Sequence, residues 1–200
     1  MNVFVLCTGR CGSTTFTRAA SHIRNFTADH ERRVRTLGPE RLSYPPNHIE
    51  VDNRLAWMLG RLEECFGKDA FYVHLRRNPE AVARSFDRRW GLKFGIISAY
   101  RDGILSGAGD AERYAICLDL VRTMESNIAA FIADKPYKMD FDLESAERDW
   151  VRFWNAIGAE GNLTASLAEW RVPHNATPPR KSILERAVSK AMRIPQELLH

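Results

Sequence analysis

Short apolar runs alternate with longer amphipathic segments along most of the chain, and this alternation predicts its architecture. Four runs have the length and composition of strands: 3–7, 48–51, 70–75 and 137–141. Five segments have the spacing of apolar residues that is typical of helices: 13–24, 53–66, 79–90, 110–132 and 144–157. Apolar strands separated by helices are typical of a parallel sheet that is covered on both sides. We therefore predict an α/β fold, a three-layer α/β/α arrangement with a central parallel sheet and a helical C-terminal half.

Three stretches lack this pattern. We expect an irregular, arginine-rich segment over 29–46, and loops with short helical turns, forming a lid, over the glycine-rich 91–110. The polar residues 171–200 begin with a proline-containing linker and end in a basic amphipathic segment over 183–199. The predicted organisation is thus one α/β domain over 1–170 and a C-terminal segment over 171–200 docked on it.

Composition and charge narrow the function. With 200 residues, of which 44% are hydrophobic and 27% charged, the chain resembles an ordinary soluble domain. Its net charge of +4 favours an anionic ligand but is too small to indicate nucleic acid binding. No apolar run approaches the length of a membrane span, and the N-terminus leads straight into a strand instead of a signal peptide. We expect a cytoplasmic protein without a membrane partner.

The four cysteines show no paired spacing typical of metal sites, and we expect reduced thiols. Cys11 stands near a predicted helix N-terminus, where the pKa of a thiol falls. Two interpretations remain for it: a target for alkylation, or a small residue tolerated in the loop, which we favour.

The residues after the first strand carry the most informative motif. Gly9 and Gly12 lie in a turn, and a hydroxyl group follows on each of the next three residues, Ser13, Thr14 and Thr15. Unpaired backbone N–H groups and the positive end of a helix dipole make such a junction an anion site. A Walker loop would have a lysine directly after the last glycine, which this chain lacks, and Arg10 supplies the cation instead.

The order Arg10-Cys11-Gly12-Ser13-Thr14 resembles the 5′-phosphosulfate loop of the sulfotransferases, which use 3′-phosphoadenosine 5′-phosphosulfate (PAPS). A second motif supports the resemblance. Arg77 follows another predicted strand and precedes Asn78-Pro79, and Ser85 comes eight residues after Arg77, as in that family. The planar donors of arginine suit a phosphate, and proline suits the first turn of a helix.

The resemblance implies a set of cofactor-binding residues, although the motifs cover only about twenty residues within 1–90. It assigns the phosphosulfate to Arg10, Cys11, Gly12, Ser13, Thr14 and Thr15, and the 3′-phosphate to Arg77 and Ser85. The implied donor is PAPS, the implied product is 3′,5′-ADP, and no metal ion is expected. His174-Asn175 lies where some relatives have a nucleotide-contacting loop.

The implied reaction is in-line transfer of a sulfuryl group to a hydroxyl or amine, with Arg10 stabilising the leaving phosphate. A general base must also take a proton from the acceptor. Members of the family use a Glu after the first helix or a His at the second strand, and we favour Glu31, with His30 orienting it or acting itself. His48 and Glu50 are further candidates, although Pro46 replaces the lysine of the usual Lys-x-His pattern.

The acceptor stays open at this point. We expect a small molecule or a carbohydrate, no nucleic acid, and leave a homodimer open. Six arginines either form a basic acceptor cleft for an anionic substrate or a solvated basic surface: Arg32, Arg33, Arg35, Arg41, Arg88 and Arg89. Two other functions compete: a P-loop kinase that uses ATP and magnesium, and a non-catalytic protein that binds a 3′-phosphonucleotide.

Overall fold

The computed structural model describes residues 1–107, 109–172 and 174. Its centre is a sheet of five parallel strands in the order β2-β3-β1-β4-β5. The strands are β1 (Val3–Cys7), β2 (Thr27–His30), β3 (His48–Val51), β4 (Phe71–Arg76) and β5 (Lys138–Asp142). The predicted basic segment over 183–199 lies outside the described residues.

β1 lies at the centre of the sheet, where the order in which successive strands are added reverses. It pairs with β3 on one side and β4 on the other, so Val5 lies between Val51 and Val73. β2 and β5 then pair outward as the two edges. Ligands of such sheets bind outside the carboxyl ends of the strands at this switch point. The loop that follows β1 therefore occupies the position expected of a binding site.

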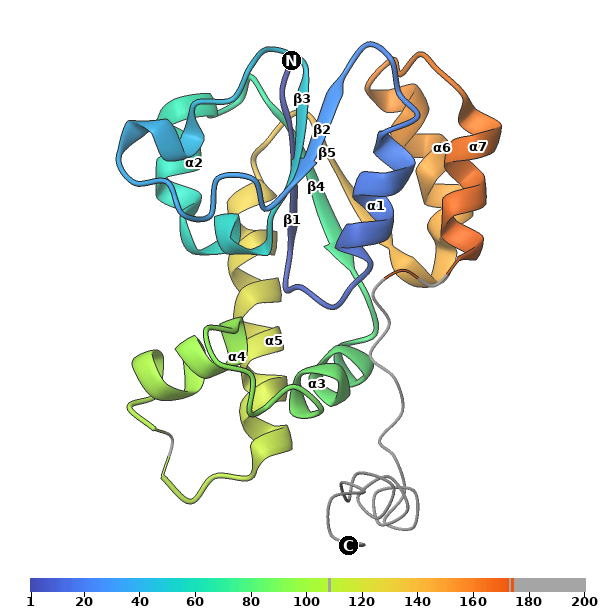
Figure 1. Cartoon of the computed structure of the whole chain (residues 1–200). Coiled ribbons are helices and arrows are strands. Elements are labelled where there is room, and N and C mark those ends of the chain that lie inside the picture. The colour runs from blue at the N-terminus through green and yellow to red at the C-terminus, as the bar shows by residue number, and fades with distance from the viewer. Residues whose placement is uncertain (108, 173, 175–200) are drawn as a thin grey trace, which may run out of the picture.

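Helices cover both faces of the sheet (Figure 1). One face carries α1 (Ser13–Ala20), α6 (Ala146–Ala156) and α7 (Leu163–Ala168), and the other carries α2 (Leu59–Phe66) and α5 (Arg113–Ile132). Side chains of β1 alternate between the two cores: Val3 and Val5 pack with the first group, and Phe4 and Leu6 with the second. The predicted α/β fold with a covered parallel sheet is confirmed.

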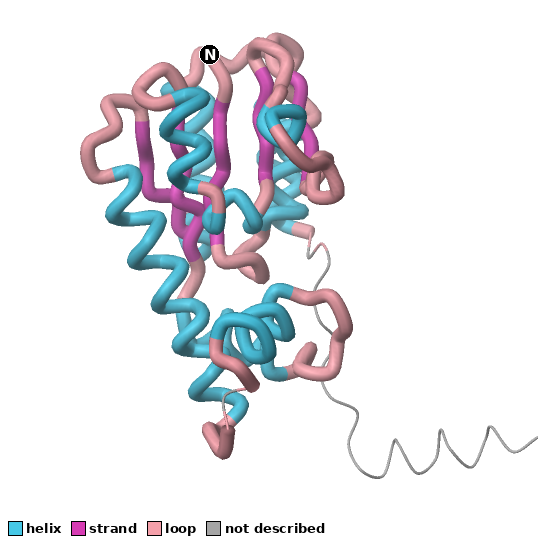
Figure 2. Tube along the Cα trace, turned by 90° about the vertical axis from the view of Figure 1, so that its left-hand side faces the viewer, coloured by secondary structure: helices cyan, strands magenta, loops and turns pink. Residues whose placement is uncertain are grey.

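Beyond the carboxyl edge of the sheet lies a smaller helical group (Figures 1 and 2). It contains α3 (Pro79–Asp87), α4 (Ile96–Ser98) and the π-helical turn η3 (Ala99–Ile104). The long α5 continues past the sheet and packs against α3. Short 3₁₀ turns complete the chain: η1 (Pro39–Leu42), η2 (Asn53–Trp57), η4 (Leu143–Ser145) and η5 (Glu169–Arg171).

The structure departs from the predicted elements in three places. The strand β2 was not predicted, and 27–30 overlaps the stretch expected to be irregular, because this edge strand reads Thr-Ala-Asp-His and is only partly buried. The helix expected over 13–24 ends at Ala20, and the one over 53–66 divides at Met58 into η2 and α2. No helix among the described residues is long and apolar enough to cross a membrane.

Candidate functional site

The loop after β1 has a backbone conformation that requires glycine. Gly9 and Gly12 have φ values of 81° and 96°, and Arg10 between them has φ 63°. A Cβ atom on Gly12 would lie 2.8 Å from Cδ1 of Leu143, and one on Gly9 would lie 2.5 Å from Nδ2 of Asn53. The two glycines therefore allow both the turn and the close approach of its neighbours. Arg10 is a non-glycine residue in the left-handed region, which is the kind of strain found at functional sites.

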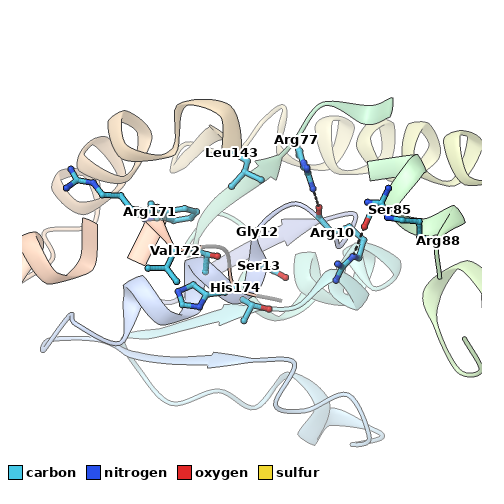
Figure 3. Close-up of a pocket in the computed structure, with 13 residues that line it drawn as sticks. Arg10, Gly12, Ser13, Arg77, Ser85, Arg88, Leu143, Arg171, Val172 and His174 are labelled. Atoms are coloured by element: carbon cyan, nitrogen blue, oxygen red, sulfur yellow. Dashed lines mark hydrogen bonds between the residues drawn. The ribbon is translucent and has the colours of Figure 1, made fainter. Parts of the chain in front are cut away.

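A cavity of about 390 Å³ opens at this loop, at the carboxyl edge of the sheet (Figure 3). It is lined by seven of the eight residues expected to bind the nucleotide: Arg10, Gly12, Ser13, Thr14, Thr15, Arg77 and Ser85. The structure thus brings the two sequence motifs to one cavity, although about seventy residues separate them. Their role in binding stays a prediction.

Two hydrogen bonds join the motifs directly (Figure 3). Nε of Arg10 donates to Oγ of Ser85 at 3.1 Å, and Nη1 of Arg77 donates to the carbonyl oxygen of Arg10 at 3.2 Å. Ser85 can take this position because Asn78 caps α3 by accepting from the N–H of Ala81, which starts the helix at Pro79. The loop after β1 and α3 therefore form one connected unit.

The cavity is strongly basic. Four arginines line it, namely Arg10, Arg77, Arg88 and Arg171, and no acidic side chain is found among the described residues of the lining. Burial lowers the pKa of Arg10, and the nearby positive charge of Arg89 lowers that pKa further, with smaller effects from Arg77 and Arg88. Mutual repulsion of these guanidinium groups is relieved when an anion enters the cavity.

Cys11 is the member of the predicted set that the cavity lining lacks. It is fully buried in the core between the sheet and α1, so its thiol is not accessible for alkylation, in keeping with the favoured interpretation of a small residue tolerated in the loop. Its contact with Cys7, through a side-chain hydrogen bond, combines with burial to raise the pKa of Cys7. All four cysteines are free thiols.

Two of the base candidates, His30 and Glu31, lie at the carboxyl end of β2. Nε2 of His30 is 3.0 Å from Oγ of Ser13, a residue of the cavity lining. Glu31 has φ 53° and pairs with Arg54, whose Nη1 lies 2.7 Å from Oε2 of the carboxylate. The structure therefore brings His30 into contact with Ser13 at the start of α1, whereas Glu31 turns toward η2.

The other two candidates, His48 and Glu50, are not brought to the cavity. His48 lies at the amino end of β3, where Nδ1 is 2.8 Å from Oγ1 of Thr27 and Nε2 is 3.1 Å from Oε2 of Glu50. Both side chains are almost completely buried, and the ring of Tyr44 stacks on His48 at 5.2 Å. These contacts give the pair a structural role beneath the segment that joins β2 to β3.

Residues at the end of the described chain also line the cavity. Val172 and His174 close the side opposite Arg10 and Ser85 (Figure 3). Nε2 of His174 lies 2.8 Å from Oε2 of Glu169, which also pairs with His22 at 3.2 Å. The sequence indicated His174 for this role, but Asn175 lies outside the described residues. Leu143, Trp170 and Arg171 were not predicted, because only the fold brings η4 and η5 to the loop.

The six arginines of the proposed basic cleft fall into different surroundings. Arg41 is buried against Asp52, Arg32 pairs with Asp29, and Arg88 lines the cavity at the loop after β1. They do not form one acceptor cleft.

Comparisons with known proteins support the fold. The chain is similar to a solved sulfotransferase domain from the curacin biosynthetic pathway, with a TM-score of 0.56 and 15% sequence identity over 89% of this chain and 80% of that one. No family model matches the sequence, and no curated protein matches it. At this identity the similarity shows a shared α/β architecture, consistent with the fold of sulfotransferases.

Proposed function

We propose that this protein is a sulfotransferase that moves the sulfuryl group of PAPS to a hydroxyl or amine of an acceptor. The observation that carries the proposal is the junction of the two motifs, in which Arg10 contacts Ser85 and Arg77 contacts the backbone of Arg10 inside one basic cavity. A donor with phosphate groups at both ends of its ribose matches such a cavity, since each motif supplies its own donors. The similarity to a sulfotransferase domain supports this choice among phosphate-binding functions.

Each sequence motif would bind a different part of the donor. Loop N–H groups, Arg10 and the hydroxyls of the first turn of α1 would hold the 5′-phosphosulfate at the positive end of the helix. Arg77 and Ser85 would hold the 3′-phosphate. The acceptor oxygen forms a bond to sulfur while the bond from sulfur to the bridging phosphate oxygen breaks. The negative charge then rests on 3′,5′-ADP, next to Arg10.

The proton of the acceptor passes to a base in the His30–Glu31 pair. Contact with Ser13 favours His30 as this base, because Ser13 lines the cavity that would hold the sulfuryl group. Glu31 is held by Arg54, and this contact orients the end of β2. His48 and Glu50 have no place in this proposal, since neither lines the cavity.

Calorimetric titration with 3′,5′-ADP, 5′-ADP and ATP, each with and without magnesium, tests the proposal. A charged hydrogen bond contributes about 1.5–3 kcal/mol, so 3′,5′-ADP should bind at least about tenfold more tightly than 5′-ADP. Magnesium should not be needed. Preference for ATP with magnesium would instead support the kinase alternative, and 3′,5′-ADP binding without sulfation of any acceptor would support the non-catalytic one.

A further inference from the structure

A second cavity, of about 710 Å³, lies in the helical group beyond the carboxyl edge of the sheet. It is formed by residues between 90 and 103, from the loop after α3 through α4 into η3, and by Arg54 at the start of η2. Two connections join it to the cavity at the loop after β1. Arg88 lines the phosphate cavity while Trp90, two residues on, lines the second. Arg54 also pairs with Glu31, which adjoins the His30 that contacts Ser13. One residue of the second cavity, Arg54, is thus in contact with the neighbour of the proposed base in the sequence.

The wall of this cavity is largely apolar. Trp90, Leu92 and Phe94 contribute to it, and Leu92 and Phe94 are 52% and 96% exposed. Phe94 has φ 60°, a left-handed conformation that is strained for an aromatic residue and leaves its ring in solvent. Exposed apolar side chains gathered at a cavity are typical of a surface that a ligand covers. These features favour an acceptor with an apolar body over a bare sugar.

The charged groups of the same wall are mostly positive. Three cations, Arg54, Lys93 and Arg101, face a single carboxylate, that of Asp102, which already pairs with Arg101. The guanidinium of Arg101 also lies over the ring of Trp90, 4.7 Å from its centroid. Lys93 is exposed and makes no ion pair with any described residue, so its charge is available to a ligand.

We infer that this cavity holds the acceptor, and that the acceptor is an amphipathic alcohol with an apolar body and a negatively charged group. The inference rests on the proposed sulfuryl transfer. The apolar body would cover the exposed side chains of Leu92 and Phe94, and the anion would pair with Lys93 at the rim. The hydroxyl would then point past Arg54 toward His30 and the phosphate loop, where the proton is removed.

Four probes separate the two features of this acceptor. They are ω-hydroxyoctanoate (apolar and anionic), octanediol (apolar and neutral), glucuronate (polar and anionic) and glucose (polar and neutral). Each is titrated calorimetrically into protein saturated with 3′,5′-ADP. We expect ω-hydroxyoctanoate to bind about tenfold more tightly than glucuronate, because only it covers the apolar wall. It should bind about three- to fivefold more tightly than octanediol, because only it pairs with Lys93.

Two substitutions and two matched controls place the binding in this cavity. Lys93→Gln should remove the preference for ω-hydroxyoctanoate over octanediol, and Phe94→Ala should weaken both by about fivefold. The controls, Lys68→Gln and Tyr137→Ala, change an exposed lysine and an exposed tyrosine at the amino edge of the sheet, and should leave binding unchanged. Unchanged melting temperatures verify that each variant is folded.

The outcomes also separate this inference from the proposed function. Tighter binding of glucuronate, or no effect of Lys93→Gln and Phe94→Ala, overturns the amphipathic acceptor while 3′,5′-ADP binding still supports sulfuryl transfer. Failure of 3′,5′-ADP itself to bind overturns the proposed function. The probes are then titrated into the nucleotide-free protein. Weaker binding of ω-hydroxyoctanoate by the Lys93→Gln and Phe94→Ala variants would show that the cavity still binds amphipathic molecules, and unchanged binding would show that it does not.

Discussion

His30 and Ser13 lie in contact at the carboxyl edge of the sheet, with Nε2 of the imidazole 3.0 Å from Oγ of the serine. The serine begins α1, and the histidine ends the strand that follows this helix. The parallel pairing of β2 with β3 and of β3 with β1 sets both residues at the same edge. In the proposed reaction, proton removal and phosphate binding would thus be served by neighbouring side chains of one β–α–β unit.

This contact predicts different consequences for substitutions of the two adjacent base candidates. His30→Gln should lower kcat by about 100-fold or more, in the range typical of a lost general base. Glu31→Gln should lower it by less than about tenfold, because the carboxylate acts through Arg54. Sulfation is measured with labelled PAPS, and calorimetry with 3′,5′-ADP serves as the control that the nucleotide site is intact. A large loss for Glu31→Gln beside near-normal rates for His30→Gln would assign the base to Glu31.

The proposed 3′-phosphate site at Arg77 and Ser85 predicts a change in nucleotide selectivity on substitution of Arg77. Arg77→Ala should weaken 3′,5′-ADP binding at least about tenfold, with a smaller effect on 5′-ADP, because a charged hydrogen bond of about 1.5–3 kcal/mol is lost. The residual effect on 5′-ADP reflects the bond from Arg77 to the Arg10 carbonyl. Arg24→Ala, an exposed arginine after α1 on the opposite edge, is the matched control. Equal losses for both nucleotides would show that Arg77 only supports the loop.

The parts of the fold that could be predicted are those with an unambiguous physical signal. β1 and β4 are buried on both faces and therefore read as continuous apolar runs. β2 gives no such signal, because an edge strand with polar residues depends on its pairing with β3. Missing that strand also concealed the contact of His30 with Ser13, since only the pairing sets the histidine beside the loop.

The loop after β1 could be singled out as a candidate site because its features are local: glycines, hydroxyls and an arginine at one strand–helix junction. Cys11 shows the limit of this approach, since the turn directs its side chain into the core instead of the cavity. The structure does not bring His48 to the cavity, because a residue at the start of a parallel strand lies away from the carboxyl edge. The residues that η4 and η5 contribute to the cavity lining could not be predicted from the sequence, because no spacing along the chain relates Leu143 to Gly12.

The close approach of Leu143 to Gly12 predicts that a methyl group added at Gly12 lowers the free energy of unfolding. Gly12→Ala should lower the free energy of unfolding by about 1–3 kcal/mol, because φ is 96° and the new Cβ would be 2.8 Å from Cδ1 of Leu143. Leu143→Ala in the same chain should recover the part due to the clash but not the backbone strain. Gly60→Ala, in open space on α2, should instead stabilise by up to about 1 kcal/mol. Urea unfolding of the variants measures these differences, and equal stabilities for Gly12→Ala and the wild type would contradict the strained loop.

The buried ion pair between Arg41 and Asp52 predicts a large loss of stability. Nη2 of Arg41 lies 2.5 Å from Oδ2 of Asp52, and the two side chains are 1% and 0% exposed. Asp52→Ala should cost about 3–5 kcal/mol, because it leaves a buried guanidinium without its partner. Asp52 also accepts from the N–H of Arg54, so the same change should loosen the contact of Arg54 with Glu31. Glu147→Ala, which breaks the exposed pair with Arg171, should cost less than about 1 kcal/mol in the same denaturation experiment.

The lowered pKa of Asp149 predicts how the free energy of unfolding depends on pH. Burial alone would raise the pKa of this carboxyl, but hydrogen bonds from Arg148, the N–H of Asp142, Ser145 and Arg152 outweigh it and lower the pKa to about 2. Since the pKa in the folded state lies below that in the unfolded chain, the ionised group adds roughly 2–3 kcal/mol of stability above about pH 4. This contribution is lost as the pH falls from about 4 to about 2. The difference in unfolding free energy between the wild type and Asp149→Asn should therefore be constant near neutral pH and shrink over this window. A difference that does not change with pH would show that Asp149 keeps an ordinary pKa, with its hydrogen bonds no stronger than its solvation in the unfolded chain.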